Sequence, residues 1–401
     1  MNFFVYFHRS NPDFALETIQ FLTQELRRQT KITRATKTAG KRDDGASESL
    51  RQSYRRSDDA VVFKVLCYDT TSWVRENFEP QVEAFNQNQE FIVLKMDYTA
   101  DRLDVNTASY AVGYDGVCLF VNDTASADVL QILSMGGVGV ICMRCAGFDR
   151  VDLNAAKTFG LDVVRVPAYS PYAVAEHAIA LLMSVNRKTH SANTRVKMAN
   201  FTLDSGLLGM DIHGKNVGVM GTGKIGQILC SIVKGFGANL LVYDVFEADC
   251  VKEMGGKYVS KEEIYQICDV IFLMMPLLPA TKHTINADVL PLLKKGVIII
   301  NTSRGGLIDT TALLDGIKSG IIGGAGLDVY ENEGDYFFQD WSAKNVDDPV
   351  LQQLLGNNKI VMTAHQAFFT REAIDKIVST TIENIQEYSE GIRGKDLSNS
   401  V

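Results

Sequence analysis

The feature that most constrains the fold of this chain is a regular alternation of short apolar runs with amphipathic segments, which begins near Val62. The apolar runs have strand length, and the segments between them carry apolar residues at helical spacing. Because strands that alternate with helices form parallel sheets with helices on both faces, the pattern predicts an α/β protein. The alternation occurs twice, on either side of a long helical stretch from about Pro171 to Asn200. We therefore predict two doubly wound domains, which the length of 401 residues also favours.

The expected strands of the first series are FKVLCY, FIVLKM, GVCLFV, VGVICM and LDVVRV. Those of the second series are KNVGVMG, NLLVYD, DVIFLMM, GVIIIN, GGAGLD and KIVMTA. The chain closes with TREAIDKIVSTTIENIQEYSEGI, a predicted helix that begins at Thr370 and Glu372 and has no strand after it. We expect this last helix to pack on the first domain.

The first sixty residues differ from the rest in composition. Residues 27–57 carry ten Lys or Arg and three acids, with no apolar periodicity. This composition predicts a largely disordered extension over residues 1–60. A transit peptide is the alternative, but such peptides avoid acids, and Asp13, Glu17 and Glu25 lie in this segment.

Charge and hydropathy narrow the class of partner. With 40 Lys plus Arg against 48 Asp plus Glu, the net charge is −8, which disfavours binding to nucleic acid or to an anionic membrane surface. The longest apolar candidate, VIFLMMPLLPA from Val270, has 11 residues and two prolines, too few to span a bilayer. A small-molecule partner is the expectation that remains.

The seven cysteines are odd in number and lie mostly within apolar runs, as expected for free thiols in a reducing compartment. They predict a cytoplasmic protein. Cys142 and Cys145 form one CxxC, but no second Cys pair or His pair stands at zinc spacing. Packing in a buried strand is therefore favoured over redox or metal chemistry, and we expect no metal.

The strongest local motif is GTGKIG, with glycines at Gly221, Gly223 and Gly226, between a predicted strand and a predicted helix. Asp244 follows 18 residues after the last glycine, at the end of LLVYD. In this context the glycines permit a tight turn, close approach of a pyrophosphate and helix packing, while the acid binds ribose hydroxyls. A glycine-rich turn without a ligand is the disfavoured alternative. The acid repels a 2′-phosphate, so the motif predicts NAD rather than NADP.

Three polar residues follow strands of the second series. Arg304 lies in NTSRGG, Glu333 in DVYENE and His365 in TAHQAF. Each has an ordinary structural alternative: an arginine at a helix end, a glutamate on a solvated loop, a histidine satisfied in the core. Ligands of open α/β sheets bind at the carboxyl ends of the strands, so the joint placement of all three favours one site.

Several motifs in fixed order carry a family resemblance. The segments GTGKIG, NTSRGGLID, GLDVYENE, TAHQAF and VPAYSPYAVAEHA resemble the D-2-hydroxyacid dehydrogenases, from about Phe63 to the C-terminus. RCAGFDRVDL, DVYENEGDYFFQDW and HQAFFT most resemble the fermentative D-lactate dehydrogenases within that family. The resemblance implies a homodimer or homotetramer. It also implies a flavodoxin-like substrate domain (61–168 and 368–401), a Rossmann NAD-binding domain (169–367) and a deep interdomain cleft.

The resemblance implies that His365 is the proton donor, Glu333 its carboxylate partner and Arg304 the substrate clamp. Simple chemistry agrees, because a carboxylate beside imidazole favours its protonated form. The planar, permanently charged guanidinium fork can orient a 2-keto acid and stabilise charge on its carbonyl oxygen.

The resemblance also suggests substrate contacts elsewhere. The backbone amides at Ala146 and Gly147 would hold the substrate carboxylate, and Tyr169 would close over it. Phe368 and Phe369 would narrow the pocket mouth and favour a short apolar tail, unless both rings pack in the core between domains.

For the cofactor, the family pattern contains one departure. Where the family usually has a His two residues before a Pro, this chain has Met274, and Leu278 replaces a frequent Thr. Because Met cannot donate a hydrogen bond, we expect weaker or altered NADH binding with the reaction retained. The cofactor residues that the resemblance adds to the glycine loop are Lys224, Ile225, Met275, Pro276, Thr281, Thr302, Ser303, Arg304 and Asp328.

The activity implied is NADH-dependent, reversible reduction of pyruvate to D-lactate. One alternative is a family member that acts on a bulkier 2-keto acid, with a product such as hydroxyisocaproate or phenyllactate. The other is a binding protein that resembles NAD-sensing transcriptional corepressors and recruits partner peptides.

Overall fold

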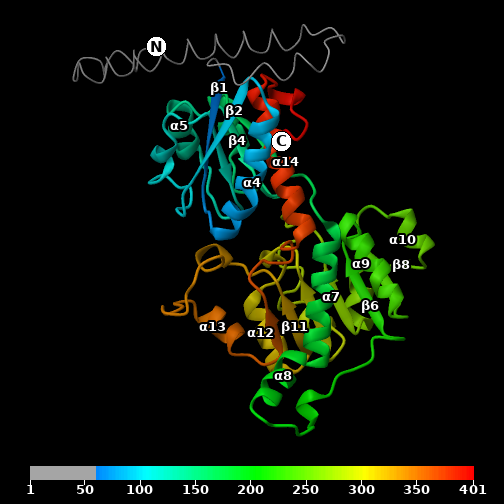
Figure 1. Cartoon of the computed structure of the whole chain (residues 1–401). Coiled ribbons are helices and arrows are strands. Elements are labelled where there is room, and N and C mark those ends of the chain that lie inside the picture. The colour runs from blue at the N-terminus through cyan, green and yellow to red at the C-terminus, as the bar shows by residue number, and fades with distance from the viewer. Residues whose placement is uncertain (1–59) are drawn as a thin grey trace. The chain divides into compact units, whose positions relative to one another are not determined.

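The computed structural model describes residues 60–401, so the predicted extension over residues 1–60 lies outside the described residues except for its last position. The described chain forms two compact units, each a parallel sheet with helices around it (Figure 1). The first unit runs to Tyr169 and resumes over Ile374–Val401, and the second unit is Ser170–Ala373. The second unit thus begins one residue later and ends six residues later than the domain 169–367 expected from the sequence.

The first unit contains five parallel strands in the order β2-β1-β3-β4-β5, which is the flavodoxin-like order and confirms the expected fold class. The strands are β1 (Val61–Cys67), β2 (Ile92–Tyr98), β3 (Gly116–Leu119), β4 (Val140–Met143) and β5 (Asp162–Arg165). They coincide with the five apolar runs of the first series. The helices of this unit are α4 (Ser72–Asn88), α5 (Ala127–Met135), α6 (Leu153–Phe159) and the 3-10 helices η1 (Ala108–Ala111) and η6 (Gly394–Asp396).

The last helix, α14 (Arg371–Ser389), belongs mostly to the first unit, as the sequence predicted. The Thr370 hydroxyl accepts a hydrogen bond from the Ala373 amide at 3.3 Å and so caps its first turn. The Asn384 side chain donates to the Arg165 carbonyl at the end of β5, at 2.9 Å. Side-chain amides and aromatic contacts therefore bind the returning chain to the sheet that was completed more than two hundred residues earlier.

The second unit contains seven parallel strands in the order β12-β11-β10-β9-β6-β7-β8. The strands are β6 (Asn216–Met220), β7 (Asn239–Tyr243), β8 (Lys257–Tyr258), β9 (Val270–Leu273), β10 (Val297–Asn301), β11 (Ile322–Leu327) and β12 (Ile360–Met362). The strand order reverses beside β6, which is where a doubly wound sheet opens a crevice for a ligand. Six strands were predicted; β8 was missed because two residues carry no periodicity.

The helices of the second unit cover both faces of its sheet. They are α7 (Pro171–Arg187), α8 (Thr189–Lys197), α9 (Lys224–Gly235), α10 (Asp249–Glu253), α11 (Lys261–Ile267), α12 (Thr310–Ser319), α13 (Pro349–Leu355) and the 3-10 helices η2 (Ser205–Leu207), η3 (Leu290–Leu292), η4 (Gly305–Leu307) and η5 (Glu333–Asp335). The single long helical stretch predicted from Pro171 to Asn200 is wrong in one respect. Lys188 adopts a left-handed conformation with φ 51° and divides the stretch into α7 and α8.

Alternate residues of the central strands fill two cores. On one face Val270 and Phe272 of β9 pack with α7 and α9, which lie side by side in Figure 1. On the other face Ile271 and Leu273 pack with α11, α12 and α13. Because both faces are buried, these strands read as continuous apolar runs, and the loops at their ends are left to carry the polar residues.

All seven cysteines of the chain lie in the described part, where none forms a disulfide and six are buried. Cys142 lies within β4 and Cys145 just after it, and burial raises the pKa of the Cys142 thiol. Packing is thus the role that the structure shows for the CxxC. In residues 60–401 no helix combines the length and the apolar character required to cross a membrane.

Candidate active site

His365 and Glu333 form a hydrogen-bonded pair. His365 lies in the loop after β12, and its Nδ1 is 2.6 Å from Oε1 of Glu333 in η5. The other carboxylate oxygen of Glu333 accepts the Tyr330 amide at 3.0 Å, which fixes the turn. The two side chains are 17% and 15% exposed. The pair orients the imidazole and leaves Nε2 as the nitrogen for a partner outside it.

The backbone of His365 has φ 51°, in the left-handed region that a non-glycine residue rarely adopts. A buried carboxylate holds this conformation in place. Asp328, at the end of β11, accepts hydrogen bonds from the amides of Gln366 and Ala367, each at 2.9 Å, and its carbonyl accepts the His365 amide at 2.7 Å. Left-handed residues of this kind persist where surrounding bonds over-determine them, often at functional sites.

Asp328 is fully buried, and its carboxylate also accepts the Thr363 hydroxyl at 2.5 Å. His177 on α7 lies beside both groups, 3.0 Å from Thr363 Oγ1 and 3.4 Å from Asp328 Oδ1. Burial alone would raise the pKa of Asp328, but the bonds from His177, Thr363 and the two amides outweigh it and hold that pKa below its usual value. The carboxylate of Asp328 thus holds the His365 loop, and the cofactor contact predicted for Asp328 stays a prediction.

Arg304 lies in the loop after β10, and Asn301 shapes that loop. The side chain of Asn301, which is fully buried, donates to the Arg304 carbonyl at 2.8 Å and accepts the Ser303 amide at 3.1 Å. Arg304 itself is half-buried, and its Nη1 donates to the Ser303 carbonyl at 2.9 Å. Because β10, β11 and β12 are parallel neighbours, the loops that carry Arg304, Glu333 and His365 leave the same edge of one sheet.

The glycine motif forms the turn from β6 into α9. Gly221 has φ 107°, and a Cβ there would lie 2.6 Å from the Met274 carbonyl carbon. A Cβ on Gly226 would lie 2.0 Å from the Gly221 carbonyl oxygen, so neither position admits a side chain. Gly223, the N-cap of α9, faces open space, and Lys224 beside it is exposed. The open helix N-terminus and the glycine turn fit the pyrophosphate of a dinucleotide, and Ile225 follows half-buried in the first turn.

Asp244 lies at the end of β7 and is already bonded to the glycine turn. Its Oδ2 accepts the Thr222 amide at 2.5 Å and the Thr222 hydroxyl at 3.2 Å, and its Oδ1 accepts the Phe246 amide at 3.2 Å. The Thr222 hydroxyl also bonds Tyr258 on β8 at 2.9 Å, and Tyr258 accepts the Ala248 amide at 2.8 Å. Tyr258 was missed by the sequence because its strand is too short to predict.

The loop after β9 contacts the loop after β10. The Ser303 hydroxyl donates to the Met275 carbonyl at 2.6 Å, and the Thr302 hydroxyl lies 3.8 Å from the Met274 sulfur. Met275 is buried, whereas Met274 is half-buried. The thioether thus accepts a weak hydrogen bond in a place where the family pattern has a group that can donate one.

The predicted cofactor residues Pro276 and Thr281 lie in a turn that follows this loop. The Thr281 hydroxyl donates to the Pro276 carbonyl at 2.6 Å and accepts the Leu278 amide at 2.8 Å. Pro276 and Leu278 are exposed, so the threonine fixes the path of a surface turn.

The remaining predicted substrate residues belong to the first unit. Ala146 and Gly147 lie half-buried in the loop after β4, at the carboxyl edge of the sheet. Arg165 donates to the Ala146 carbonyl at 2.8 Å, and the Cys145 thiol lies 3.2 Å from the Gly147 carbonyl. Tyr169 is the last residue before the second unit and is half-buried.

Aromatic rings surround the His365 loop. Phe368 is 6% exposed and packs edge-on against Phe369, which is 51% exposed, with ring centroids 5.9 Å apart. Phe338, in the aromatic insertion after Glu333, lies 6.1 Å from the imidazole by centroids. The sequence did not single out Phe338, although its place five residues after Glu333 in DVYENEGDYFFQDW was available as a signal.

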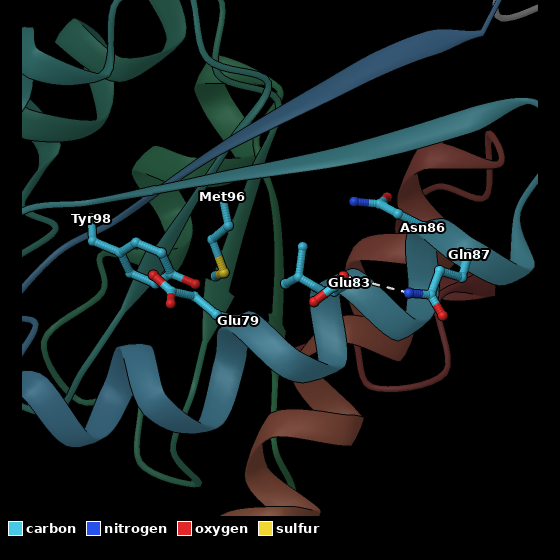
Figure 2. A pocket seen from close by; sticks show the side chains of 7 residues that line it. Glu79, Glu83, Asn86, Gln87, Met96 and Tyr98 are labelled. Atoms are coloured by element: carbon cyan, nitrogen blue, oxygen red, sulfur yellow. Dashed lines mark hydrogen bonds between the residues drawn. The ribbon is translucent and has the colours of Figure 1, made fainter. Parts of the chain in front are cut away.

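A cavity of about 280 Å³ lies in the first unit between α4 and β2 (Figure 2). Glu79 and Glu83 of α4 line it together with Met96 and Tyr98 of β2. None of the predicted site residues lines this cavity.

Comparison with known proteins shows that the chain is similar to 2-hydroxyacid dehydrogenases. Residues 179–367 match the family model of the D-isomer specific 2-hydroxyacid dehydrogenase, NAD binding domain. A 2-hydroxyacid dehydrogenase homolog of Haemophilus influenzae is 44% identical over 82% of this chain and 97% of its own length. A D-lactate dehydrogenase of Escherichia coli is 43% identical over the same shares. The solved structure of the pyruvate reductase of Chlamydomonas reinhardtii is 43% identical, with a TM-score of 0.77 over 84% of this chain and 98% of that one.

Proposed function

Because the chain belongs to the D-isomer specific 2-hydroxyacid dehydrogenase family and is an NAD-dependent oxidoreductase, we propose that it reduces pyruvate to D-lactate and catalyses the reverse oxidation. The observation that carries the proposal is the His365–Glu333 pair on a sheet edge shared with the Arg304 loop. A proton donor and a cation that binds the keto acid, on one sheet edge, are what reduction of a 2-keto acid requires. The names of the relatives from Escherichia coli and Chlamydomonas reinhardtii support pyruvate as the substrate.

His365 is the proposed proton donor. Its Nε2, which the Glu333 pair leaves available, gives a proton to the carbonyl oxygen of the keto acid as that oxygen gains charge. Glu333 compensates the charge of the imidazolium before the transfer and holds the ring orientation throughout. In the reverse direction the neutral ring accepts the hydroxyl proton of D-lactate.

Arg304 is the proposed substrate clamp. Its guanidinium fork can bind the keto acid through two parallel hydrogen bonds and stabilises the negative charge that grows on the carbonyl oxygen. The amides at Ala146 and Gly147 are proposed to hold the substrate carboxylate, with Tyr169 closing over it. Lys in place of Arg304 would lack the fork geometry.

The cofactor site is proposed from the glycine turn and its neighbours. NADH, when bound, supplies the hydride that reduces the keto carbon. Gly223 and the N-terminus of α9 would hold the pyrophosphate, and Asp244 the adenosine ribose. The exposed Val245 and Phe246 after Asp244 place no cation against a 2′-phosphate, which favours NADH over NADPH.

Substrate choice is proposed to depend on the aromatic rings around His365. Phe338 and Phe368, with Phe369 against Phe368, lie by the His365 loop, and we propose that these rings admit a short apolar tail such as the pyruvate methyl. Steady-state assays over a panel of 2-keto acids with NADH, followed by chiral analysis of the product, test this. The expected result is the highest kcat/KM for pyruvate and a D product. A higher kcat/KM for branched or aromatic 2-keto acids would refute pyruvate as the substrate and favour the bulkier alternative.

The chain is also proposed to self-associate, as a homodimer or homotetramer. In the segment from α8 to η2, large apolar side chains are strongly exposed, among them Met198 at 68%, Phe201 at 75% and Leu203 at 91%. Strong exposure of several large apolar side chains within one short segment is typical of a surface that a second copy covers. Light scattering should give a multiple of 44.3 kDa that falls toward one copy in Leu203→Asp. A wild-type mass of a single copy would contradict the proposal.

The free thiols support a cytoplasmic location, because a reducing compartment keeps cysteines unpaired. Fractionation of cells that express the chain, with an antibody to it, tests this location. Recovery in an oxidising compartment would overturn it.

A further inference from the structure

A second histidine–glutamate pair lies in the same unit as His365 and Glu333. His283 Nε2 is 2.7 Å from Oε1 of Glu331, and the two side chains are 32% and 25% exposed. Glu331 precedes Glu333 by two residues, so one turn after β11 supplies the carboxylate of both pairs. Like His365, His283 has φ 51° in the left-handed region.

The second oxygen of Glu331 bonds a third segment. Its Oε2 accepts the Thr310 amide at 2.9 Å and the Thr310 hydroxyl at 2.7 Å, at the first residue of α12. One carboxylate therefore joins the loop that contains His283, the start of α12 and the turn that contains Glu333. A helix N-terminus is a favourable place for such a charge.

The backbone around His283 is bound to the residues that follow Arg304. The His283 amide donates to the Gly306 carbonyl at 2.8 Å, and the Ile285 amide donates to the Leu307 carbonyl at 3.1 Å. Ile285 also forms an isolated parallel bridge with Ile308. The segment that carries His283 thus lies along the loop that carries Arg304.

The same loop rests directly on the turn that supplies the glutamates. A Cβ on Gly305 would lie 2.1 Å from the Tyr330 carbonyl carbon and 2.5 Å from the Glu331 nitrogen. No side chain fits there, so the backbone next to Arg304 is in contact with the backbone next to Glu331.

We propose that His283 and Glu331 form a positioning pair for the reaction: they fix the Arg304 loop against the turn that holds Glu333, so that the substrate clamp and the proton donor keep one geometry. The inference rests on the proposed 2-keto acid reductase function. A single partly exposed pair of this kind contributes little to global stability, and its proposed effect is on the relative placement of two loops. A small misplacement of the clamp is enough to weaken its hold on the keto acid, which raises KM and so lowers kcat/KM.

The test compares His283→Ala with His283→Gln, whose side-chain amide can still donate to Glu331. The matched control is His213→Ala, which removes an exposed histidine of the same unit that bonds only a backbone carbonyl, that of Phe236. For each protein we would measure kcat and KM for the keto acid, the NADH dissociation constant and the thermal midpoint. Amide hydrogen exchange of peptides covering residues 303–310 is a readout independent of activity.

The expected result for His283→Ala is a rise in KM for the keto acid of about tenfold, with unchanged NADH binding and a nearly unchanged thermal midpoint. Exchange over residues 303–310 should rise in the same variant. His283→Gln should restore both properties in large part, and His213→Ala should match the wild type. Glu331→Gln combined with His283→Ala should add little to the single change, because the two residues act together.

Unchanged KM and unchanged exchange in His283→Ala would overturn the positioning pair while leaving the proposed function intact. A loss of kcat that follows a lower thermal midpoint, with KM unchanged, would reduce the pair to a structural contact and also overturn it. Failure of the wild type to reduce any 2-keto acid would refute the proposed function instead. In that case increased exchange in His283→Ala would still support the loop geometry.

Discussion

Each unit places an arginine just after a strand of its sheet, yet the two arginines have opposite environments. Arg144, directly after β4, is fully buried, whereas Arg304, after β10, is half-buried. Arg144 donates to the Asp69 carbonyl at 2.8 Å, and its guanidinium lies 4.7 Å from the centroid of the Phe120 ring. In the first unit the arginine is enclosed, and its guanidinium bonds the Asp69 carbonyl after β1 and the Cys118 carbonyl in β3. In the second unit the Arg304 side chain is partly exposed.

Electrostatics sharpen this difference. Burial alone would lower the pKa of Arg144, but Cys67, Cys118 and Asp123 around it hold that pKa above its ordinary value. The guanidinium is therefore charged inside the fold, where removal of either the cation or its partners would leave an uncompensated buried group. An arginine at a strand end is thus no sufficient sign of a ligand site, since the residues around it decide whether it binds substrate or stabilises its own unit.

The largest expected effect concerns His365, in the second unit. His365→Ala should lower kcat by about 10²–10⁴-fold, the range that follows loss of a general acid. NADH binding and the thermal midpoint should be preserved, because the bonds from Asp328 that hold the loop go to backbone amides and do not involve the imidazole. Stopped-flow kinetics and fluorescence titration measure the two properties. Turnover equal to that of the wild type would remove His365 from the mechanism.

Replacing each of the two arginines by leucine tests the comparison between them most directly. Arg144→Leu should lower the free energy of unfolding by about 3–5 kcal/mol, because buried acids lose their cation. Arg304→Leu should leave unfolding nearly unchanged and lower kcat/KM by about 10²–10³-fold. Urea titration and steady-state kinetics on both variants give the four values. Equal losses of stability would show that the two environments do not differ as described.

The stability of the first unit should also depend on pH, through the buried Asp123 near Arg144. Burial raises the pKa of Asp123 to about 7, against opposing effects from Arg144 and two backbone amides. The folded state then binds a proton that the unfolded state has released, so stability falls as pH rises from about 4 to about 7, by at most about 1.4 kcal/mol per pH unit. Urea midpoints of wild type and Asp123→Asn across this window test the prediction. The slope should flatten in the variant, and an identical slope would contradict the assignment.

The smallest expected effect concerns the cofactor loop. Met274→His should lower the dissociation constant of NADH by about threefold to tenfold, because a ring nitrogen can donate the hydrogen bond that a thioether cannot. Thr302, now 3.8 Å from the sulfur, would keep an acceptor beside it. Fluorescence titration with NADH measures the change, with Met275→Leu as a control for loss of a neighbouring thioether. Weaker binding in Met274→His would show that the loop is adapted to methionine.

The fold was largely predictable because its information is local. Strands buried on both faces read as apolar runs, and Gly221 and Gly226 of the β6–α9 turn stand where backbone atoms leave no room for a side chain. The errors have equally local causes. Lys188 carries no breaking signal, yet it adopts φ 51° and divides the predicted helix. The two residues of β8 are too few to show a period.

The candidate site was predictable only in its principal residues. Arg304, Glu333 and His365 follow clear strands, so their shared edge could be inferred from order alone. Their partners could not, because each depends on a tertiary contact. Nothing in the sequence around His283 indicates that its hydrogen-bond partner is Glu331, 48 residues later. Likewise, no sequence pattern indicates that the buried carboxylate of Asp328 bonds the His365 loop.

The return of the chain to the first unit has a consequence for synthesis on the ribosome. The amides of Arg165 and Val401 join β5 to the last residues, through the carbonyls of Asn399 and Val163 at 3.1 Å each. The first unit therefore cannot complete its edge until translation reaches those residues, whereas the second unit has all of its strands earlier. Domains usually fold in the order in which they are made. In this chain the second unit can fold first, although it is made later. Until the last residues are made, β5 of the first unit lacks the hydrogen bonds that they supply.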